Sequence, residues 1–408
     1  MGDVHRRSRF DPLIVPDVDP FAPAKLGPLM LRNRFIKAAT FEGATPKRVV
    51  TDTLIDFHRR VAAGGVGMTT VAYCAVSSDG TTDGRQIVLT DEAVPGLRKL
   101  TDAIHAEGAA ASAQIGHAGP VANPMGTKHP SLAPSRVFAP IGMRFTKRVT
   151  EDDITRVTRD YAEGAKRLVS SGFDAIEIHM GHNYLLSAFF SPRLNKRRDR
   201  WGGSIENRAR LARQVAKAVR DAVGTHIAVT AKYNMADGPK RGLQPDASIA
   251  IAKLLESDGT LDALQLTGGS SFNDPMFLFR GDAPIADMAA TMPRFMRLGF
   301  KALSGRMMPS YPYAEAYFLP LAARFRTVLS MPLILLGGIT KAATIDKAMA
   351  NGFEFVAMAR ALLREPDLVN RMQADRAVEA TCIHCNRCMP SIYTGTRCVL
   401  DHPEPIKA

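Results

Sequence analysis

The sequence predicts a closed (β/α)8 barrel, the TIM-barrel fold, followed by a short cysteine-containing extension. Short apolar runs rich in β-branched residues alternate with helix-like stretches about eight times between residues 33 and 373, which is typical of a parallel α/β sheet. Eight strands favour closure into a barrel. The alternative, an open doubly wound sheet, lacks its G-x-G-x-x-G motif after an early strand.

The predicted elements divide the chain into three parts. Residues 1–20 form an N-terminal extension, 21–375 the barrel, and 376–408 a cysteine-rich segment. The predicted strands are residues 34–39, 67–75, 110–115, 175–179, 227–232, 261–266, 333–336 and 354–358. The predicted helices include 51–63, 151–171, 204–223, 246–257 and 341–350, with Ser204 and Thr340 as N-caps. Two stretches, 119–150 and 267–313, interrupt this rhythm and are expected over the barrel mouth.

Composition limits the function classes. The chain has 408 residues, 46% of them hydrophobic and 23% charged, which suits one large globular body. No apolar run approaches the roughly 20 residues that cross a bilayer, and the basic start lacks a signal-peptide core, so we expect a cytoplasmic protein without membrane contact. The net charge of +13 is spread along the chain. This distribution favours electrostatic attraction of an anionic substrate, or a role in solubility, over nucleic-acid binding.

The fourth predicted strand ends in a cluster that suits proton and hydrogen-bond chemistry. His179 closes the strand on its interior-facing set, and His182 and Tyr184 follow in the loop. Two imidazoles can donate hydrogen bonds to a carbonyl-type oxygen, and a phenol can protonate a carbon that becomes anionic after hydride arrives. A metal-binding pair, or loop side chains with structural partners, explains the same triplet.

Polar residues also close two neighbouring strands. Gln114 ends the strand 110–115 and Lys232 ends the strand 227–232, both on the side of small residues that suit a crowded barrel interior. The two side chains are therefore candidates to face one ligand. Each is equally well explained as a structural polar group at a strand end.

The last two strands end in a predicted phosphate site. Gly337 and Gly338 follow the seventh strand, and Ala359 and Arg360 follow the eighth. Glycine lets backbone N–H groups approach an anion, the next helix N-terminus adds its dipole, and arginine supplies a charged fork. The loops after strands seven and eight are the common phosphate position of these barrels. The alternative is a tight turn with a surface arginine.

Five motifs together resemble the old yellow enzyme-type NADH:flavin oxidoreductases over roughly residues 20 to 373. The motifs are residues 33–40 (NRFIKAAT), 114–119 (QIGHAG), 178–192 (IHMGHNYLLSAFFSP), 199–208 (DRWGGSIENR) and 357–360 (AMAR). The resemblance implies FMN as cofactor and NAD(P)H as electron donor. It implies FMN contacts from Ala39, Thr40, Gln114, Lys232 and the predicted phosphate site, substrate-oxygen binding by His179 and His182, and proton donation by Tyr184.

Four of the five cysteines lie near the end of the chain, at Cys382, Cys385, Cys388 and Cys398. Their spacing resembles the iron–sulfur segment of the 2,4-dienoyl-CoA reductase and trimethylamine dehydrogenase branch. Four thiolates satisfy a [4Fe–4S] cluster. A structural zinc site or free thiols also fit the residues.

The expected function is an NAD(P)H-linked ene-reductase that acts on an activated C=C bond of a small molecule. The alternative is an FMN and [4Fe–4S] dehydrogenase of a small amine or another small substrate. Relatives with this cluster continue into a second flavin and nicotinamide domain that this sequence lacks, so a separate electron-transfer partner is expected. A non-catalytic binding protein for nucleic acid or another anion is disfavoured by the scattered charge. Homo-oligomer formation stays open.

Overall fold

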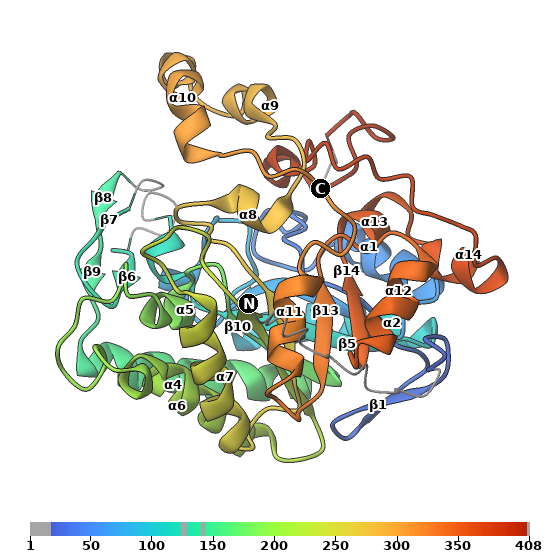
Figure 1. Cartoon of the computed structure of the whole chain (residues 1–408), viewed down its shortest axis with the longest axis horizontal. Helices are drawn as coiled ribbons and strands as arrows, with labels where there is room; N and C mark the ends of the chain where they lie inside the picture. Colours follow the sequence, from blue (N-terminus) through green and yellow to red (C-terminus); the bar gives the residue numbers. More distant parts are fainter. Residues whose placement is uncertain (1–17, 124–128, 140–142, 406–408) are drawn as a thin grey trace, which may run out of the picture.

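The centre of the computed structural model is a closed barrel of eight parallel strands (Figure 1). The structure describes residues 18–123, 129–139 and 143–405. Around the barrel the order is β10, β11, β12, β13, β14, β3, β4 and β5. In chain order these strands are β3 (Phe35–Lys37), β4 (Met68–Ala75), β5 (Ala110–Gly116), β10 (Ala175–Met180), β11 (Ala228–Asn234), β12 (Ala263–Thr267), β13 (Leu333–Leu336) and β14 (Phe355–Met358). The predicted fold class is confirmed, and every predicted strand overlaps one of the eight.

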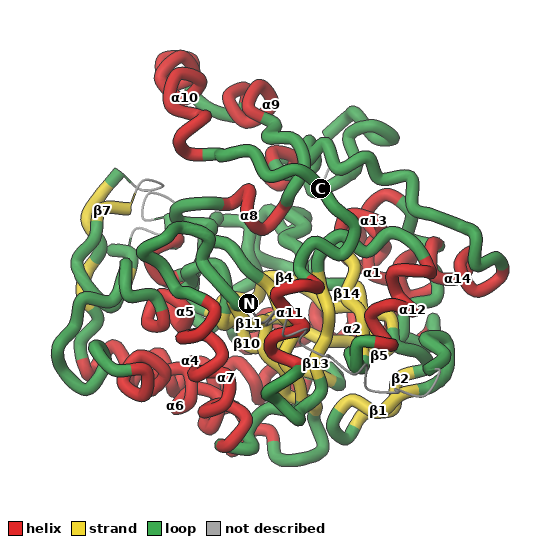
Figure 2. The backbone as a smooth tube through the Cα atoms, in the orientation of Figure 1, coloured by secondary structure: helices red, strands yellow, loops and turns green. Residues whose placement is uncertain are grey.

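Helices cover the outside of the strands (Figure 2). They are α1 (Asp52–Ala63), α2 (Val94–Ala106), α4 (Glu151–Ser170), α5 (Leu185–Phe190), α6 (Ile205–Val223), α7 (Pro245–Ser257), α11 (Leu319–Arg326), α12 (Ala342–Ala350), α13 (Arg360–Arg364) and α14 (Leu368–Ala374). Because helices cover one face of each strand and the barrel interior covers the other, parallel strands are buried on both sides. All seven residues of β11 are buried accordingly.

The N-caps show where local sequence sets the helix starts. Ser204 accepts a hydrogen bond from the backbone of Asn207 at the start of α6, as predicted. Thr340 was wrong as an N-cap, because α12 begins one residue later, after Lys341. The Thr340 hydroxyl instead donates to Glu315 Oε2 at 2.7 Å, a tertiary contact that the sequence pattern does not contain.

A hairpin closes the N-terminal end of the barrel. It consists of β1 (Ala24–Leu26) and β2 (Leu29–Leu31), which pair antiparallel. Leu26 and Leu31 are buried in one apolar cluster with Ile36, Ile334 and Phe355 from the barrel strands. The opposite end, where the strands finish, is therefore the end that remains for a site.

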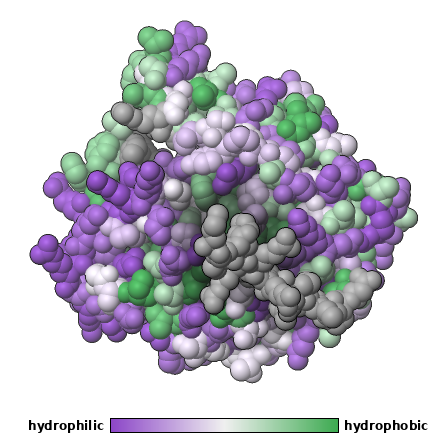
Figure 3. Space-filling model, in the orientation of Figure 1, coloured by the Kyte–Doolittle hydropathy of each residue, from purple (hydrophilic) through white to green (hydrophobic). Residues whose placement is uncertain are grey.

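The two irregular stretches form additions to the barrel. The first carries the short strands β6 (Leu132–Ala133), β7 (Phe138–Ala139), β8 (Arg144–Phe145) and β9 (Lys147–Arg148), and the second carries α8 (Pro275–Phe279), α9 (Ile285–Ala290) and α10 (Arg294–Met307). Helices α9 and α10 stand out from the body of the barrel (Figure 1). Phe295 and Leu298 on α10 are more than 80% exposed, and Figure 3 shows apolar residues (green) beside hydrophilic ones (purple) at this end of the molecule. Within the described part of the chain, no helix combines the length and apolar character needed to cross a membrane.

Candidate functional site

The three residues predicted at the end of the fourth strand lie together. His179 is the penultimate residue of the buried strand β10, and Tyr184 lies beyond the strand as the N-cap residue of α5. The ring of His179 stacks on the ring of Tyr184 with 4.2 Å between centroids and an interplanar angle of 1°. The His182 ring meets His179 edge-on at 5.2 Å. The backbone of His182 has a positive φ of 58°, which turns the loop back over the strand end.

Hydrogen bonds and burial fix the charge state of these groups. The backbone N–H of Gly181 donates to His179 Nδ1 at 3.2 Å, so the proton of neutral His179 resides on Nε2. Burial lowers the pKa of His179 well below its usual value, and it lowers the pKa of His182 to about 3. Burial raises the pKa of Tyr184 to about 12. At neutral pH both imidazoles are therefore uncharged and the phenol keeps its proton.

Two residues at this cluster were missed by the sequence reasoning. The ring of Tyr73 contacts His179 and Tyr184 edge-on, at 6.1 and 5.4 Å between centroids, and its hydroxyl donates to the carbonyl of Gly80. The hydroxyl of Thr267 lies 3.0 Å from His182 Nε2. Thr267 ends β12, so the polar-strand-end signal used for Gln114 and Lys232 would have found it.

Gln114 and Lys232 meet through a third side chain, Glu177 on β10. Gln114 Nε2 donates to Glu177 Oε1 at 2.6 Å, and Lys232 Nζ lies 3.4 Å from the same oxygen. Lys232 Nζ also donates to the carbonyl of Ala39 at 3.3 Å. The Thr40 hydroxyl has other partners. It accepts a hydrogen bond from Lys37 Nζ at 3.0 Å, and Lys37 also pairs with the buried Glu42 carboxylate. All three of Gln114, Glu177 and Lys232 are buried.

The predicted phosphate residues line one pocket. They are Gly337, Gly338, Ala359 and Arg360. Gly337 and Gly338 have positive φ angles of 106° and 73°, and a Cβ on either would lie within 2.8 Å of the Phe318 or Tyr317 ring. Only glycine fits this backbone path. The pocket also includes His384, from the cysteine segment.

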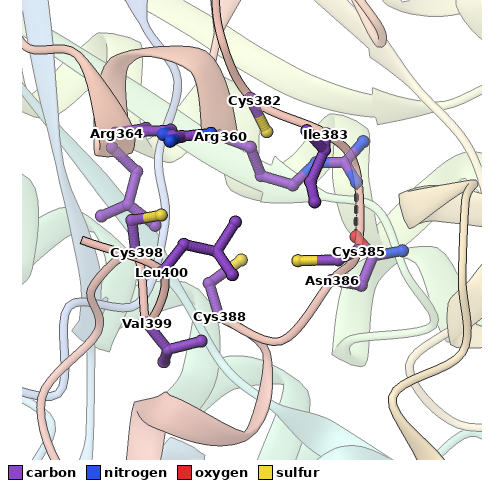
Figure 4. A pocket seen from close by; sticks show the side chains of 11 residues that line it. Arg360, Arg364, Cys382, Ile383, Cys385, Asn386, Cys388, Cys398, Val399 and Leu400 are labelled. Carbon is purple, nitrogen blue, oxygen red and sulfur yellow. Dashed lines mark hydrogen bonds between the residues drawn. The ribbon is translucent and has the colours of Figure 1, made fainter. Parts of the chain in front are cut away.

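Arg360 has less freedom than the sequence suggested. One guanidinium nitrogen, Nη2, donates to the carbonyl of Phe279 at 2.6 Å. The other, Nη1, donates to the carbonyl of Arg280 and to the side chain of Asn386 (Figure 4). Its position on the wall of the pocket is therefore set by α8 and by the cysteine segment together.

The four predicted cysteines line a second pocket. Cys382, Cys385, Cys388 and Cys398 surround it with their sulfur atoms directed toward a common space (Figure 4). Burial raises the pKa of Cys388 to about 11, so this thiol is protonated at neutral pH. Among the described residues there is no group of three or more His, Cys, Asp or Glu side chains compact enough for one metal ion.

The cysteine segment, residues 376–405, has little regular structure and is held by individual bonds. Its one helical turn is η4 (Pro390–Tyr393). Arg364 on α13 bonds Asp401 at 2.9 Å, and the backbone N–H of Thr396 donates to the carbonyl of Glu42 at 2.8 Å. Gly43 approaches the segment so closely that a Cβ there would lie 2.3 Å from the carbonyl oxygen of Ile392. The segment thus packs against the loop after β3 and against the phosphate pocket.

Comparison with known proteins agrees with this architecture. Residues 19–258 match the NADH:flavin oxidoreductase / NADH oxidase family. The chain is 56% identical over 380 residues to 4,4'-dithiodibutanoate disulfide reductase of Rhodococcus erythropolis, covering 93% of this chain and 94% of that protein. It is 29% identical to the multifunctional alkene reductase/demethylase OYE of Caballeronia cordobensis, over 90% of this chain and 50% of that one.

Solved structures share the fold. The old yellow enzyme homologue of Zymomonas mobilis matches 90% of this chain and 96% of its own, with a TM-score of 0.70 and 22% identity. The chain spans about half the length of several other curated relatives, which are 27 to 31% identical to it. The length of the family match and the identity to the Rhodococcus protein decide the classification. The chain therefore belongs to the NADH:flavin oxidoreductase / NADH oxidase family and is an FMN-dependent oxidoreductase.

Proposed function

We propose that this protein transfers electrons from NAD(P)H to a small, electron-poor organic substrate, with His179, His182 and Tyr184 as the substrate-facing groups. The observation that carries the proposal is the stacked His179–Tyr184 pair with His182 beside it, at the end of a strand flanked by Gln114 and Lys232. All three substrate-facing side chains are neutral at pH 7, so each offers a hydrogen-bond or proton donor without a competing charge.

The residues present fit FMN. Gly337, Gly338, Ala359 and Arg360 line one pocket, where backbone N–H groups and a guanidinium would suit a phosphate. Lys232 and Gln114 would face the flavin ring, where a cation and an amide stabilise its reduced form. When bound, FMN supplies the redox chemistry by accepting and passing on two electrons as hydride.

The chain itself supplies orientation and a proton. His179 Nε2–H and His182 bind an electron-rich atom of the substrate and stabilise the negative charge that develops on hydride transfer. Tyr184 then delivers its phenolic proton to the atom that has become anionic. The Tyr73 ring, packed edge-on against both His179 and Tyr184, keeps their rings parallel.

An organic disulfide is the first substrate class. The Rhodococcus erythropolis relative bears the name of a 4,4'-dithiodibutanoate disulfide reductase, and at 56% identity it is similar along nearly its whole length. Reduction adds one hydride and one proton: the S–S bond breaks, the sulfur that receives the hydride becomes one thiol, and the other sulfur, released as a thiolate, would take its proton from Tyr184. A dicarboxylate also suits a chain with a net charge of +13, which attracts anions to its surface.

An activated C=C bond is the second substrate class, because the same donors fit it. The two histidines would bind the carbonyl oxygen of an enone, and Tyr184 would protonate the α-carbon after hydride reaches the β-carbon. The Caballeronia cordobensis relative, named an alkene reductase/demethylase, supports this class.

We also propose a [4Fe–4S] cluster in the cysteine pocket. Cys382, Cys385, Cys388 and Cys398 supply the four thiolates that such a cluster needs, and a single zinc ion is the alternative that the same thiolates could bind. Four thiols around an open space suit a larger cluster. Anaerobically purified protein should contain about four irons and four sulfides per chain; zinc in place of iron would contradict this part of the proposal.

Anaerobic stopped-flow mixing tests the substrate. The flavin is first reduced with NADH or NADPH and then mixed with 4,4'-dithiodibutanoate or with cyclohexenone. We expect the disulfide to reoxidise the flavin fastest and to yield two thiols per NAD(P)H. If neither compound reoxidises the flavin, while an amine such as N,N-dimethylglycine reduces the oxidised enzyme, the protein works as an amine dehydrogenase with an external electron acceptor.

A further inference from the structure

One arginine belongs to two pockets. Arg360 lines the phosphate pocket and also the pocket of the four cysteines (Figure 4). Its guanidinium bonds the side chain of Asn386, which lies in the sequence between Cys385 and Cys388. The direction of this guanidinium is therefore set in part by a residue of the cysteine segment.

Asn386 uses both of its side-chain N–H groups and its side-chain oxygen in hydrogen bonds. Its side chain is buried, and its amide nitrogen donates to the carbonyls of Arg280 at 2.8 Å and Asp282 at 3.0 Å while its oxygen accepts from Arg360. These bonds tie the cysteine loop to the chain that follows α8. Removing the Asn386 side chain would leave Arg360 Nη1 with a single acceptor, the carbonyl of Arg280 at 3.3 Å.

His384 provides a second contact between the cysteine segment and the phosphate pocket. It stands between Cys382 and Cys385 in the sequence, and it is one of the residues that line the phosphate pocket. Its ring stacks on Tyr313 with 3.4 Å between centroids and an angle of 10°. The Tyr313 hydroxyl in turn lies 3.3 Å from the carbonyl of Gly338.

We propose that the cysteine segment completes the FMN phosphate site, with Asn386 positioning Arg360 and His384 forming one wall. FMN affinity then depends on whether the cysteine pocket is filled. The reason is that a bound cluster would fix Cys382, Cys385 and Cys388, and with them the residues between. Without it, a segment with almost no regular structure must hold the same positions through single hydrogen bonds. By linkage, bound FMN stabilises the filled segment to the same extent. This inference rests on the cluster and FMN site proposed above.

Flavin titrations of the iron-replete protein test the positioning role. FMN and riboflavin, which lacks the phosphate, are each added to protein freed of flavin, and quenching of flavin fluorescence gives Kd. Asn386→Ala should weaken FMN about tenfold, the effect of losing one hydrogen bond to a charged group. His384→Ala removes one wall of the pocket and should also weaken FMN, and riboflavin affinity should be unchanged in both variants. Arg387→Ala is the matched control, because Arg387 lies in the same loop but bonds Asp287 on α9.

Removal of iron by an anaerobic chelator tests the coupling in the unmodified protein. FMN affinity should fall about tenfold, again with riboflavin unaffected. An equal loss of FMN and riboflavin affinity, or FMN affinity within twofold of the Arg387→Ala protein in all samples, would overturn the inference. These titrations measure no turnover, so their failure leaves the proposed reductase activity standing. A protein that passes them but reduces no substrate refutes the reductase activity instead.

Discussion

The strand-end cluster and the cysteine segment are built by different means. At the barrel mouth the neighbours are set by the strand ladder: His179 is the register partner of Lys232, and Glu177 is the register partner of Gln114. In the cysteine segment the neighbours are set by side chains that reach backbone carbonyls, as Asn386 does with Arg280 and Asp282. The strand ladder holds its residues through many regular backbone bonds, whereas the segment is held by a few side chains, each with its own set of partners.

The difference predicts which region depends on its ligand. His179, His182, Gln114 and Lys232 are buried, so their arrangement should persist when the flavin is absent. The cysteine pocket has little regular structure around it and depends on individual side-chain bonds such as that of Arg364 to Asp401. We therefore expect substitutions at the barrel mouth to change chemistry with the fold retained, and substitutions in the segment to change local order.

The largest effect should come from the proton donor. Tyr184→Phe should slow reoxidation of reduced flavin by substrate about 10²- to 10³-fold, because a positioned acid contributes on that order. Flavin content should not change. Tyr73→Phe is the control, because its hydroxyl bonds the carbonyl of Gly80 and not the reacting groups; its rate should stay within about threefold. Equal rates in Tyr184→Phe and the unmodified enzyme would remove Tyr184 from the mechanism.

Loss of a cysteine should make the cysteine segment less ordered. Cys385→Ser should lower the iron content and raise the rate of proteolysis within residues 376–405 by at least about tenfold, as expected for a region freed from its own ligand. The barrel should resist proteolysis as before. Cys74→Ala provides the comparison, since Cys74 is buried on β4 and does not line the cysteine pocket. Unchanged iron in Cys385→Ser would show that this thiol is not a ligand.

A smaller effect is expected at Lys232. Lys232→Met removes the cation that pairs with Glu177 and bonds the carbonyl of Ala39. Reduction of the flavin by NAD(P)H should slow about tenfold, in keeping with the loss of one charge-assisted contact to a buried group. Lys232→Arg keeps the charge and should recover most of the rate. The measurement is the reductive half-reaction, followed at the flavin absorbance; a normal rate in Lys232→Met would contradict a role near the ring.

The smallest effect should be that of pH. Because His182 loses its proton near pH 3 and Tyr184 keeps its proton up to about pH 12, the rate of substrate reduction should vary less than about threefold between pH 6 and 9. The lowered pKa of His182 also makes the stability of the protein depend on pH, because the unfolded chain binds a proton near pH 6.5 and the folded chain does not. The free energy of unfolding should therefore fall as pH drops from about 6.5 toward 3, and less steeply in His182→Gln. A rate that titrates near pH 6.5 would show a charged histidine in the site.

Much of the fold and part of the site followed from the sequence. The alternation of strands and helices predicted the barrel because parallel strands must be separated by crossover helices. Strand parity predicted that His179, Gln114 and Lys232 share the interior, because successive side chains in a strand point to opposite faces. Cysteine spacing predicted one pocket for four thiols, and the structure brings them together there.

Only the tertiary structure decided which partners the longer side chains take. Glu177 joins Gln114 to Lys232, while Thr40 turns to Lys37 and Arg360 turns to Asn386. The physical reason is side-chain length. Strand geometry fixes the face of the sheet from which a side chain projects, but a long, flexible side chain bonds whichever group packs beside it. Lys232 Nζ, for example, donates to the carbonyl of Ala39, which lies 193 residues away in the sequence. The hydrophobic periodicity of the sequence does not predict such a distant partner.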